Sequence, residues 1–366
     1  MFSAPCPNSR TGLWRLPKMT PTHAASLVRE LSQPLVSGAF LTERDRKRLL
    51  EVLPDAAGET LDAFAAAAMA VRRARIGDAA SLCAIVSAKS GRCGENCAFC
   101  AQSGHYATDA PQHPLLPPER IVAAAAAMAR QGVTRFGVVA SGKALPDAEL
   151  ESVATALAGI AALPMAADAS LGVLAEDALA RLKAAGLAAY HHNLETSRNF
   201  YPSICTSRTF EDNLEVLRAC RRRGIPVCSG GLFGMGETWA DRADLARTLL
   251  EMGVFSVPVN FLSPIAGTPL ANRPVLSRDE ARRIVVLLRF LLPDRHIRIC
   301  GGRPTVFGSE ASLAPMAAGA DGLMVGDYLT TSGGALDADR QGLEKLGFVV
   351  AKAGEARCAS CRCRGL

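Results

Sequence analysis

Short β-prone segments alternate with amphipathic helical segments over most of this chain of 366 residues. We predict strands at Leu82–Ser87, Thr134–Ala140, Met165–Ala169, Ala188–Asn193, Pro226–Ser229, Ser256–Phe261, Ile297–Cys300 and Gly322–Val325. We expect helices at Pro118–Gln131, Asp147–Ala161, Glu176–Ala185, Thr209–Arg223, Thr238–Met252, Ser277–Leu291 and Ser309–Ala318. Repeated β-α units imply parallel strands with right-handed crossovers. The pattern predicts an α/β fold with a (β/α)8 barrel of the TIM type; a doubly wound open sheet is the competing topology.

The predicted barrel occupies residues 78–335, between an N-terminal helical extension at 23–77 and a cysteine-containing C-terminal tail at 336–366. Residues 1–22 contain prolines and lack the apolar core of a secretory signal. We expect them to be disordered or to precede a translation start at Met19. No apolar run approaches the roughly 18 residues that span a bilayer, so we expect no membrane segment and a cytoplasmic protein.

Charge and aromatic content argue against a nucleic-acid partner. The formal net charge is +6, and basic runs such as 221–223 fall at a predicted helix end, where cations suit the helix dipole. Aromatic residues make up only 5% of the chain, too few for a base-stacking surface. The chain has 12 cysteines, and in a reducing compartment clustered cysteines indicate metal ligands rather than disulfides.

Three cysteines lie on a short loop directly after the first predicted strand, at Cys93, Cys97 and Cys100. Three thiolates can hold three corners of a cubane cluster and leave one iron open to a non-protein ligand. Zinc is the alternative, but a structural zinc site requires four ligands. The spacing C-x3-C-x2-C resembles the radical S-adenosylmethionine superfamily. That resemblance implies a [4Fe–4S] cluster whose open iron binds S-adenosylmethionine and whose electron cleaves it to a 5′-deoxyadenosyl radical.

Longer motifs narrow the resemblance to the biotin synthase family. They are Cys100–Ser103 with Tyr106, Tyr190–Ser197, Val227–Thr238, Val257–Phe261, Gly267–Leu270, Arg298–Arg303 and Tyr328–Thr331. The resemblance covers roughly residues 82–347 and implies an enzyme that inserts sulfur into dethiobiotin. It also implies an electron donor such as flavodoxin or ferredoxin, and a homodimer.

The resemblance assigns cofactor contacts to the segment after the fourth predicted strand. Asn193 and Glu195 would bind the ribose hydroxyls of S-adenosylmethionine. In an extended strand they share one face with His191. Glu195 capping the next turn is the alternative role. Gly230 and Gly231 would let the backbone approach the cofactor closely, although glycines in any strand-to-helix turn look similar.

Substrate contacts follow from the same resemblance. Asn260 would bind the ureido ring of dethiobiotin, since an amide both donates and accepts hydrogen bonds. Thr330 and Thr331 would bind the substrate carboxylate, with a plain turn role as the alternative. His191 stands where the family has asparagine, so it is either a substrate contact or a core histidine bonded to the backbone.

The chain departs from the family at the second cluster. The usual [2Fe–2S] cluster of the family, its sulfur source, has three cysteine ligands and one arginine. Two of those cysteine positions fall here on Gly137 and Asp168, which leaves Cys228 and Arg298. Glycine has no donor atom, and a hard carboxylate is a poor replacement for a thiolate.

A group of cysteines near the C-terminus offers a replacement. Cys358, Cys361 and Cys363 form a C-x2-C-x-C motif. We hypothesise that they bind an auxiliary cluster, [4Fe–4S] rather than [2Fe–2S], with one of Cys228 or Cys300 completing its ligands. A surface zinc site or an exposed tail is the alternative.

Two rival functions share the cysteine loop. One is another radical enzyme of the same branch, such as a hydrogenase-cofactor maturase or an amino-acid mutase. The other is a non-catalytic iron–sulfur protein, which would not cleave S-adenosylmethionine.

Overall fold

The computed structural model describes residues 21–308, 312–326 and 336–350. Its central strands are β1 (Ala79–Lys89), β2 (Arg135–Ala140), β3 (Ala166–Ser170), β4 (Leu187–His191), β5 (Val227–Cys228), β6 (Gly231–Phe233), β7 (Ser256–Phe261), β8 (His296–Ile299) and β9 (Gly322–Met324). They run in the order β1-β2-β3-β4-β5-β7-β8-β9, and β1 pairs with β9 to close the sheet. Short β6 follows β5 and also pairs with β7, so the two share one barrel position. The pairings between these strands are parallel, which confirms the (β/α)8 barrel and excludes the open sheet.

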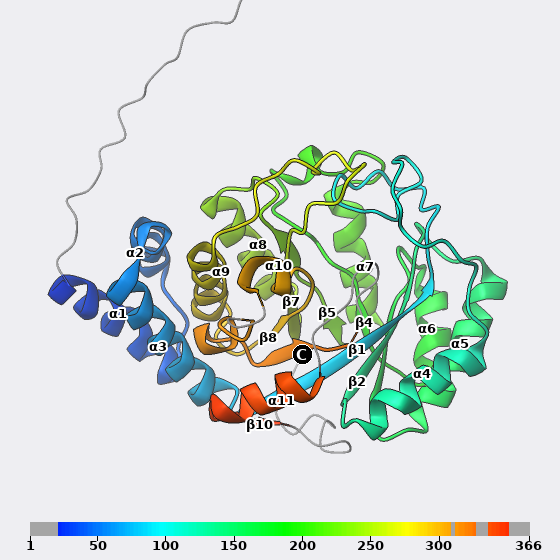
Figure 1. Cartoon of the computed structure of the whole chain (residues 1–366), viewed down its shortest axis with the longest axis horizontal. Coiled ribbons are helices and arrows are strands. Elements are labelled where there is room, and N and C mark those ends of the chain that lie inside the picture. Colours follow the sequence, from blue (N-terminus) through cyan, green and yellow to red (C-terminus); the bar gives the residue numbers. More distant parts are fainter. Residues whose placement is uncertain (1–20, 309–311, 327–335, 351–366) are drawn as a thin grey trace, which may run out of the picture.

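Helices cover the outside of the barrel (Figure 1). They are α4 (Pro118–Arg130), α5 (Asp147–Ala161), α6 (Glu176–Ala184), α7 (Phe210–Arg222), α8 (Trp239–Glu251) and α9 (Arg278–Leu291). Capping boxes begin two of them, because Thr209 and Thr238 each exchange hydrogen bonds with the aspartate three residues later. Glycines end α4 and α7, since Gly132 and Gly224 take the positive φ angles of 77° and 60°.

The last β-α unit differs from the prediction. A helix at 309–318 is wrong for the described residues, because 312–315 form turns and only a 3-10 turn, η3 (Met316–Ala318), follows. Instead, α10 (Arg303–Phe307) begins directly after β8. Pro304 suits the first turn of a helix, and Gly308, with a φ of 64°, ends it.

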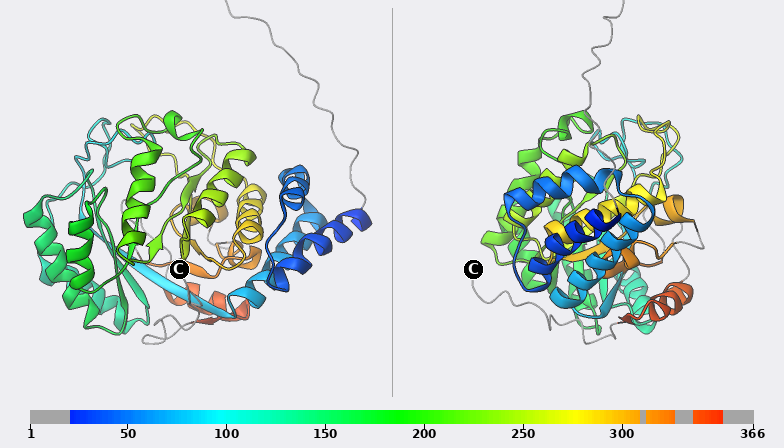
Figure 2. Two further views of the ribbon diagram at one scale, coloured as in Figure 1. Left: turned by 180° about the vertical axis from the view of Figure 1, so that it is seen from behind. Right: turned by 90° about the vertical axis from the view of Figure 1, so that its left-hand side faces the viewer.

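The N-terminal segment packs against one side of the barrel (Figure 2). It consists of α1 (Pro21–Val36), α2 (Glu43–Val52), the short η1 (Leu53–Asp55) and α3 (Gly58–Arg75). Helix α3 lies on α9, where Phe64 and Phe290 meet edge to face with ring centroids 5.9 Å apart. The extension therefore continues the hydrophobic core outward from α9.

Residues 336–350, which we predicted to be part of the tail, are instead folded onto the barrel. They form α11 (Leu336–Lys345) and β10 (Val349–Val350), and β10 pairs in parallel with the start of β1. A buried bidentate ion pair joins Arg303 of α10 to Asp339 of α11, with both N–O distances 2.7 Å. The sequence did not predict that residues 336–350 pack on the barrel, because the Arg303–Asp339 contact joins elements that are not neighbours in the chain.

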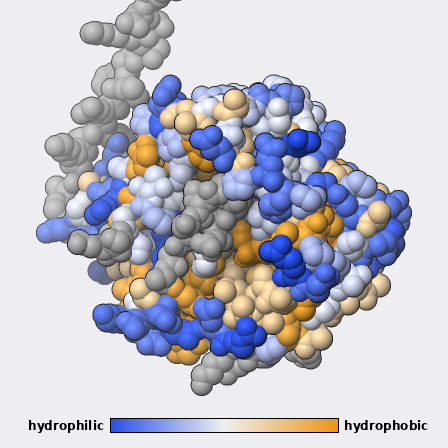
Figure 3. Space-filling view, turned by 45° about the vertical axis from the view of Figure 1, so that its right-hand side comes forward, coloured by the Kyte–Doolittle hydropathy of each residue, from blue (hydrophilic) through white to orange (hydrophobic). Residues whose placement is uncertain are grey.

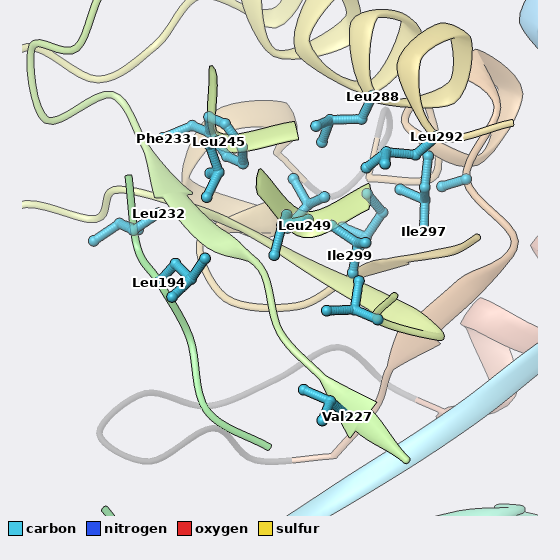
Figure 4. Close-up of a cluster of buried hydrophobic side chains, with 14 of the residues drawn as sticks. Leu194, Val227, Leu232, Phe233, Leu245, Leu249, Leu288, Leu292, Ile297 and Ile299 are labelled. Carbon is cyan, nitrogen blue, oxygen red and sulfur yellow. The ribbon is translucent and has the colours of Figure 1, made fainter. Parts of the chain in front are cut away.

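The core between helices and strands is built from branched aliphatic side chains. Figure 4 shows Leu288 and Leu292 of the α9 region facing Ile297 and Ile299 of β8, with Leu249 of α8 beside them. All of these side chains are fully buried. On the face drawn in Figure 3, polar residues are spread widely and apolar residues gather near the centre. Among the described helices, none has the length and hydropathy of a membrane span.

A buried ion pair holds the end of the barrel opposite the cysteine loop. Arg289 of α9 donates to Asp321, just before β9, at 2.7 Å, and to the carbonyl of Gly319 at 2.8 Å. The second carboxylate oxygen of Asp321 accepts from His296 Nδ1 at 2.6 Å. Both partners of the Arg289–Asp321 pair are almost completely buried, so neither charge can be hydrated if the other is removed.

We expect Arg289→Met to lower the free energy of unfolding by about 3–5 kcal/mol, because it strands a buried carboxylate. Chemical denaturation followed by circular dichroism measures the change. The control is Arg282→Met, which removes a pair with the exposed Asp62 and should cost about 0–1 kcal/mol. Equal losses in the two variants would contradict the prediction.

Candidate active site

The C-terminal ends of the barrel strands open into a cavity of about 450 Å³. This is the end at which (β/α)8 enzymes carry their chemistry. The cavity brings together ten of the residues selected from the sequence: Cys93, Cys97, Cys100, His191, Asn193, Glu195, Cys228, Asn260, Arg298 and Cys300. These ten residues come from five barrel strands, β1, β4, β5, β7 and β8, and the loops that follow them, and they face one space.

The other selected residues do not line this cavity or cannot be placed. Gly230 and Gly231 pack against backbone instead: a Cβ at Gly230 would lie 1.9 Å from the Pro258 carbonyl oxygen, and one at Gly231 would lie 2.5 Å from that of Glu195. Their lack of a side chain therefore serves strand packing. Five predicted residues lie outside the described part of the chain: Thr330, Thr331, Cys358, Cys361 and Cys363.

The cysteine loop folds back on itself through backbone hydrogen bonds. Cys93 N donates to the Gln102 carbonyl at 3.0 Å, and Gly104 N donates to the Cys93 carbonyl at 2.7 Å. Cys100 N donates to the Cys97 carbonyl at 3.0 Å. These bonds form a compact loop, so three thiols from eight consecutive residues face the cavity together.

A second loop, residues 204–208 after β4, holds the cysteine loop in place. Asn96 Oδ1 accepts from the backbone N–H groups of Thr206 and Ser207 at 2.9 and 3.1 Å. The Ser207 hydroxyl donates to buried Glu95 at 2.6 Å, and Ala98 N donates to the Ile204 carbonyl at 2.8 Å. This support was not predicted, because the two loops lie about a hundred residues apart in the sequence.

Two residues of that second loop flank a predicted iron ligand. The sulfur of Cys205 lies 3.8 Å from that of Cys97, and Arg208 Nη2 lies 3.9 Å from the Cys97 sulfur. A hydrogen bond from Cys97 lowers the pKa of Cys205 to about 5. The sequence offers no spacing signal for either residue, because an isolated cysteine is usually an ordinary buried apolar residue. The arginine supplies positive charge beside a site that would hold several thiolates.

The geometry of the cysteine loop suits a cluster better than a single ion. Among the described residues, no group of three or more His, Cys, Asp and Glu side chains is arranged to hold one metal ion. In an iron–sulfur cluster each thiolate binds a different iron, so its ligands are spread around the cluster. The three cysteines are compatible with that requirement, because they line one cavity that has space for a cluster.

The predicted row His191, Asn193 and Glu195 exists, although not as an extended strand. Strand β4 ends at His191, and Glu195 has a positive φ of 67°. The side chains form a chain of hydrogen bonds: His191 Nε2 donates to Asn193 Oδ1 at 3.0 Å, and Asn193 Nδ2 donates to Glu195 Oε2 at 3.4 Å. Burial raises the pKa of Glu195 to about 7 and lowers the pKa of His191. The row thus presents polar groups to the cavity with little net charge.

Asn260 is held at the same mouth by the barrel backbone. Its Oδ1 accepts from Gly301 N at 2.9 Å, and its Nδ2 lies 3.4 Å from the Gly231 carbonyl oxygen. These contacts fix the orientation of the amide at the end of β7. The side chain lines the cavity, so its remaining hydrogen-bonding capacity is available to a ligand.

Deeper in the barrel, a group of thiols surrounds Arg298. The guanidinium interacts electrostatically with Cys83, Cys228 and Cys300. Burial raises the pKa of Cys228 to about 11, with Arg298 acting in the opposite direction. Cys83 was missed, because an isolated cysteine in a strand is usually an ordinary apolar residue. Only the closed barrel places it beside the other three residues.

The two positions that depart from the family motif also line the cavity. Gly137 on β2 pairs with Asp168 on β3. Both Asp168 oxygens accept from Arg135, from Nε at 2.8 Å and from Nη2 at 2.6 Å. The carboxylate is therefore neutralised by a neighbouring strand and is not directed at a metal.

Two family models match successive parts of the chain. Residues 88–249 match the radical SAM superfamily, and residues 258–349 match the biotin and thiamin synthesis associated domain. A biotin synthase from Syntrophotalea carbinolica is 47% identical over 307 residues, covering 83% of this chain and 92% of the relative. One from Pelobacter propionicus is 43% identical, covering 89% of this chain and 98% of the relative. The chain belongs to the biotin synthase family.

Solved structures support the fold of this family member. A methylornithine synthase superposes with a TM-score of 0.74 at 20% identity, covering 89% of this chain and 98% of that protein. An FeFe-hydrogenase maturase from Carboxydothermus hydrogenoformans superposes with a TM-score of 0.72 at 18% identity, covering 91% of this chain and 85% of that protein. At such identities the likeness concerns the fold alone.

We expect Asn96→Ala to loosen the cysteine loop in this biotin synthase family member without removing a thiol. A half-buried hydrogen-bond group of this kind contributes roughly 1 kcal/mol, which is about a fivefold change in an equilibrium. Iron should therefore pass to a chelator about fivefold faster from the anaerobically reconstituted variant. Gln112→Ala is the control, since this exposed side chain lies at the edge of the loop, where its Oε1 accepts from Arg92 Nε. Identical release rates for the two variants would refute the role given to Asn96.

Proposed function

We propose that this chain is a biotin synthase, which inserts sulfur into dethiobiotin and uses S-adenosylmethionine as its radical source. One observation carries the proposal: the three thiols of a C-x3-C-x2-C loop meet in the same cavity as the polar row and Asn260. Membership of the biotin synthase family supports it. A carrier protein would have no use for a shaped cavity next to its cluster.

Cys93, Cys97 and Cys100 would hold a [4Fe–4S] cluster. When bound, that cluster supplies the electron that cleaves S-adenosylmethionine to the radical that removes hydrogen from dethiobiotin. The residues around it keep the ligands in register, with residues 204–208 bonded to the loop through Asn96 and Glu95. Glu95 and Cys97 are buried, so water has little access to these two side chains.

Asn193 and Glu195 would bind the ribose hydroxyls of S-adenosylmethionine. The Asn193 Oδ1 already accepts from His191 and from Gly230 N, at 3.0 and 3.1 Å, which fixes the amide. Among the described residues, the Glu195 carboxylate accepts one hydrogen bond, a long one from Asn193 Nδ2 at 3.4 Å. Its carboxylate therefore retains acceptor capacity for a pair of hydroxyls.

Asn260 would bind the ureido ring of dethiobiotin, and His191 would contact the substrate from across the cavity. Both side chains line the cavity and are already oriented by protein hydrogen bonds. Thr330 and Thr331 are proposed for the substrate carboxylate on the family motif alone. The orientation of dethiobiotin matters, because each hydrogen atom must be removed from one particular carbon of this flexible substrate.

The proposal includes a second iron–sulfur cluster as the sulfur source, with Cys228 and Arg298 on its wall of the cavity. It also includes a flavodoxin- or ferredoxin-type electron donor, a cytoplasmic location and a homodimer. These last features come from the family resemblance. Binding of this cluster by the C-terminal cysteines at 358, 361 and 363 is the alternative to ligands within the barrel.

The reconstituted protein should form biotin when incubated anaerobically with dethiobiotin, S-adenosylmethionine and a reductant. Mass spectrometry detects biotin, and chromatography detects 5′-deoxyadenosine. We expect Cys100→Ala to lower both products at least 100-fold, because the loop can no longer hold three irons. The control Cys220→Ala, on α7 and away from the cavity, should retain both.

The two products separate the rival functions. Formation of 5′-deoxyadenosine without biotin would replace the proposal with another radical enzyme of this branch. Absence of both products from protein with a full iron content would indicate a non-catalytic iron–sulfur protein.

The ionisation of Glu195 should make cofactor binding depend on pH. Its pKa is raised to about 7 by burial, so the carboxylate becomes protonated and loses acceptor capacity as the pH falls below that value. Between pH 8 and pH 6 the ionised fraction falls from about nine-tenths to about one-tenth. We expect the KM for S-adenosylmethionine to rise several-fold over this interval.

The Glu195→Gln variant should have a KM that stays nearly constant over the same interval, because its amide does not titrate. Glu251→Gln, at the exposed end of α8, is the control and should keep the rise. A rise of equal size in Glu195→Gln would assign the pH dependence to another group.

A further inference from the structure

We infer that the second iron–sulfur cluster is bound within the barrel by the thiolates of Cys83, Cys228 and Cys300, beside Arg298. The inference rests on the proposed function and names the ligands that the family motif does not supply. Three thiols and one arginine line the same cavity as the cysteine loop. The site is complete without the C-terminal cysteines.

The positions expected from the family motif do not fit a cluster. Gly137 has no side chain, and a Cβ there would already lie 3.2 Å from Ile85 Cγ2. Asp168 is bound at both oxygens by Arg135. Any cluster on this wall of the barrel would therefore have to be held from other strands.

Strand register brings Cys83 and Cys300 to one level of the barrel. Leu82 of β1 and Ile299 of β8 both pair with Leu323 of the strand between them, β9. The next residue of each strand is a cysteine, and both cysteines line the cavity. The two thiols thus flank β9 at the same height.

Cys228 is the third thiol of the proposed site, and it lies on the side of β8 away from β9. It ends β5 and pairs with Ser256 of β7, which in turn pairs with β8. The Cys300 thiol interacts electrostatically with Cys83, Cys228 and Arg298. The three thiols therefore approach one volume from three non-adjacent strands, which is the arrangement in which each can bind a different iron.

Arg298 is a buried cation with an unused donor. Its exposed fraction is 5%, and Nη1 has no hydrogen-bond partner among the described residues. The side chain lies over Gly322, where a Cβ would be 3.2 Å from Arg298 Cγ. A buried donor without an acceptor is costly. A cluster carrying negative thiolates and sulfides would supply both the acceptor and the opposite charge.

The test counts iron and sulfide on the full chain in a background that lacks the first site, Cys93→Ala with Cys97→Ala and Cys100→Ala. After anaerobic reconstitution, this background should retain iron, sulfide and a visible and Mössbauer signature of one cluster. Adding Cys83→Ala should lower the iron and sulfide content at least fourfold, and Cys83→Ser should do the same. Serine nearly preserves the shape of cysteine, so this variant separates loss of a ligand from loss of the fold.

Two control variants test whether the cluster is bound within the barrel. Cys220→Ala removes a buried cysteine outside the cavity and should leave the cluster in place. The triple change Cys358→Ala, Cys361→Ala and Cys363→Ala should also leave it. If the cluster survives Cys83→Ala or Cys83→Ser, or if it is lost with the C-terminal cysteines, the inference is overturned.

These counts do not depend on biotin formation. A wild-type protein that fails to make biotin, yet loses a cluster on Cys83→Ser, would refute the proposed function and support this site. A wild-type protein that makes biotin, with a second cluster that survives the loss of Cys83, would support the proposed function and refute this site.

Discussion

Pairing between β1 and β9 closes the barrel, and the composition of the cavity depends on it. Residues 81–83 pair with residues 322–324, and Ser81 N donates to the Asp321 carbonyl at 3.0 Å. Closure brings the carboxyl ends of all the parallel strands to one mouth. Cys83 of the first barrel strand and Cys300 at the end of the seventh, which lie on either side of β9, thereby come to line one cavity.

The two loops at this mouth support one another, and that support gives the cysteine loop a defined shape. Short peptides with three cysteines bind metals in many arrangements, because the free backbone has large conformational entropy. Here the entropy is removed before any metal binds, through hydrogen bonds from residues 204–208 to Asn96 and Glu95. Arg208, from the same segment, supplies positive charge next to Cys97.

Charge compensation explains how the barrel interior tolerates its departures from the family motif. Where a thiolate is absent, Asp168 is paired with Arg135 on the neighbouring strand. Where Arg298 has no carboxylate partner in the described structure, thiols surround it. A buried charge requires a partner or a pKa shift. Arg135 has a carboxylate partner, whereas Arg298 lies beside thiols. The part of the barrel around Arg298 is therefore the part that suits a cluster.

Local patterns in the sequence determined the barrel strands, the glycine stops after helices and the cysteine loop, because each depends on neighbours within one turn or one strand. They missed α10 and the folding of residues 336–350 onto the barrel, which depend on contacts such as Arg303–Asp339. They also missed Cys83 and Arg208. Only barrel closure decides which side chains of distant strands meet, since the order in which strands pair depends on contacts between residues far apart in the sequence.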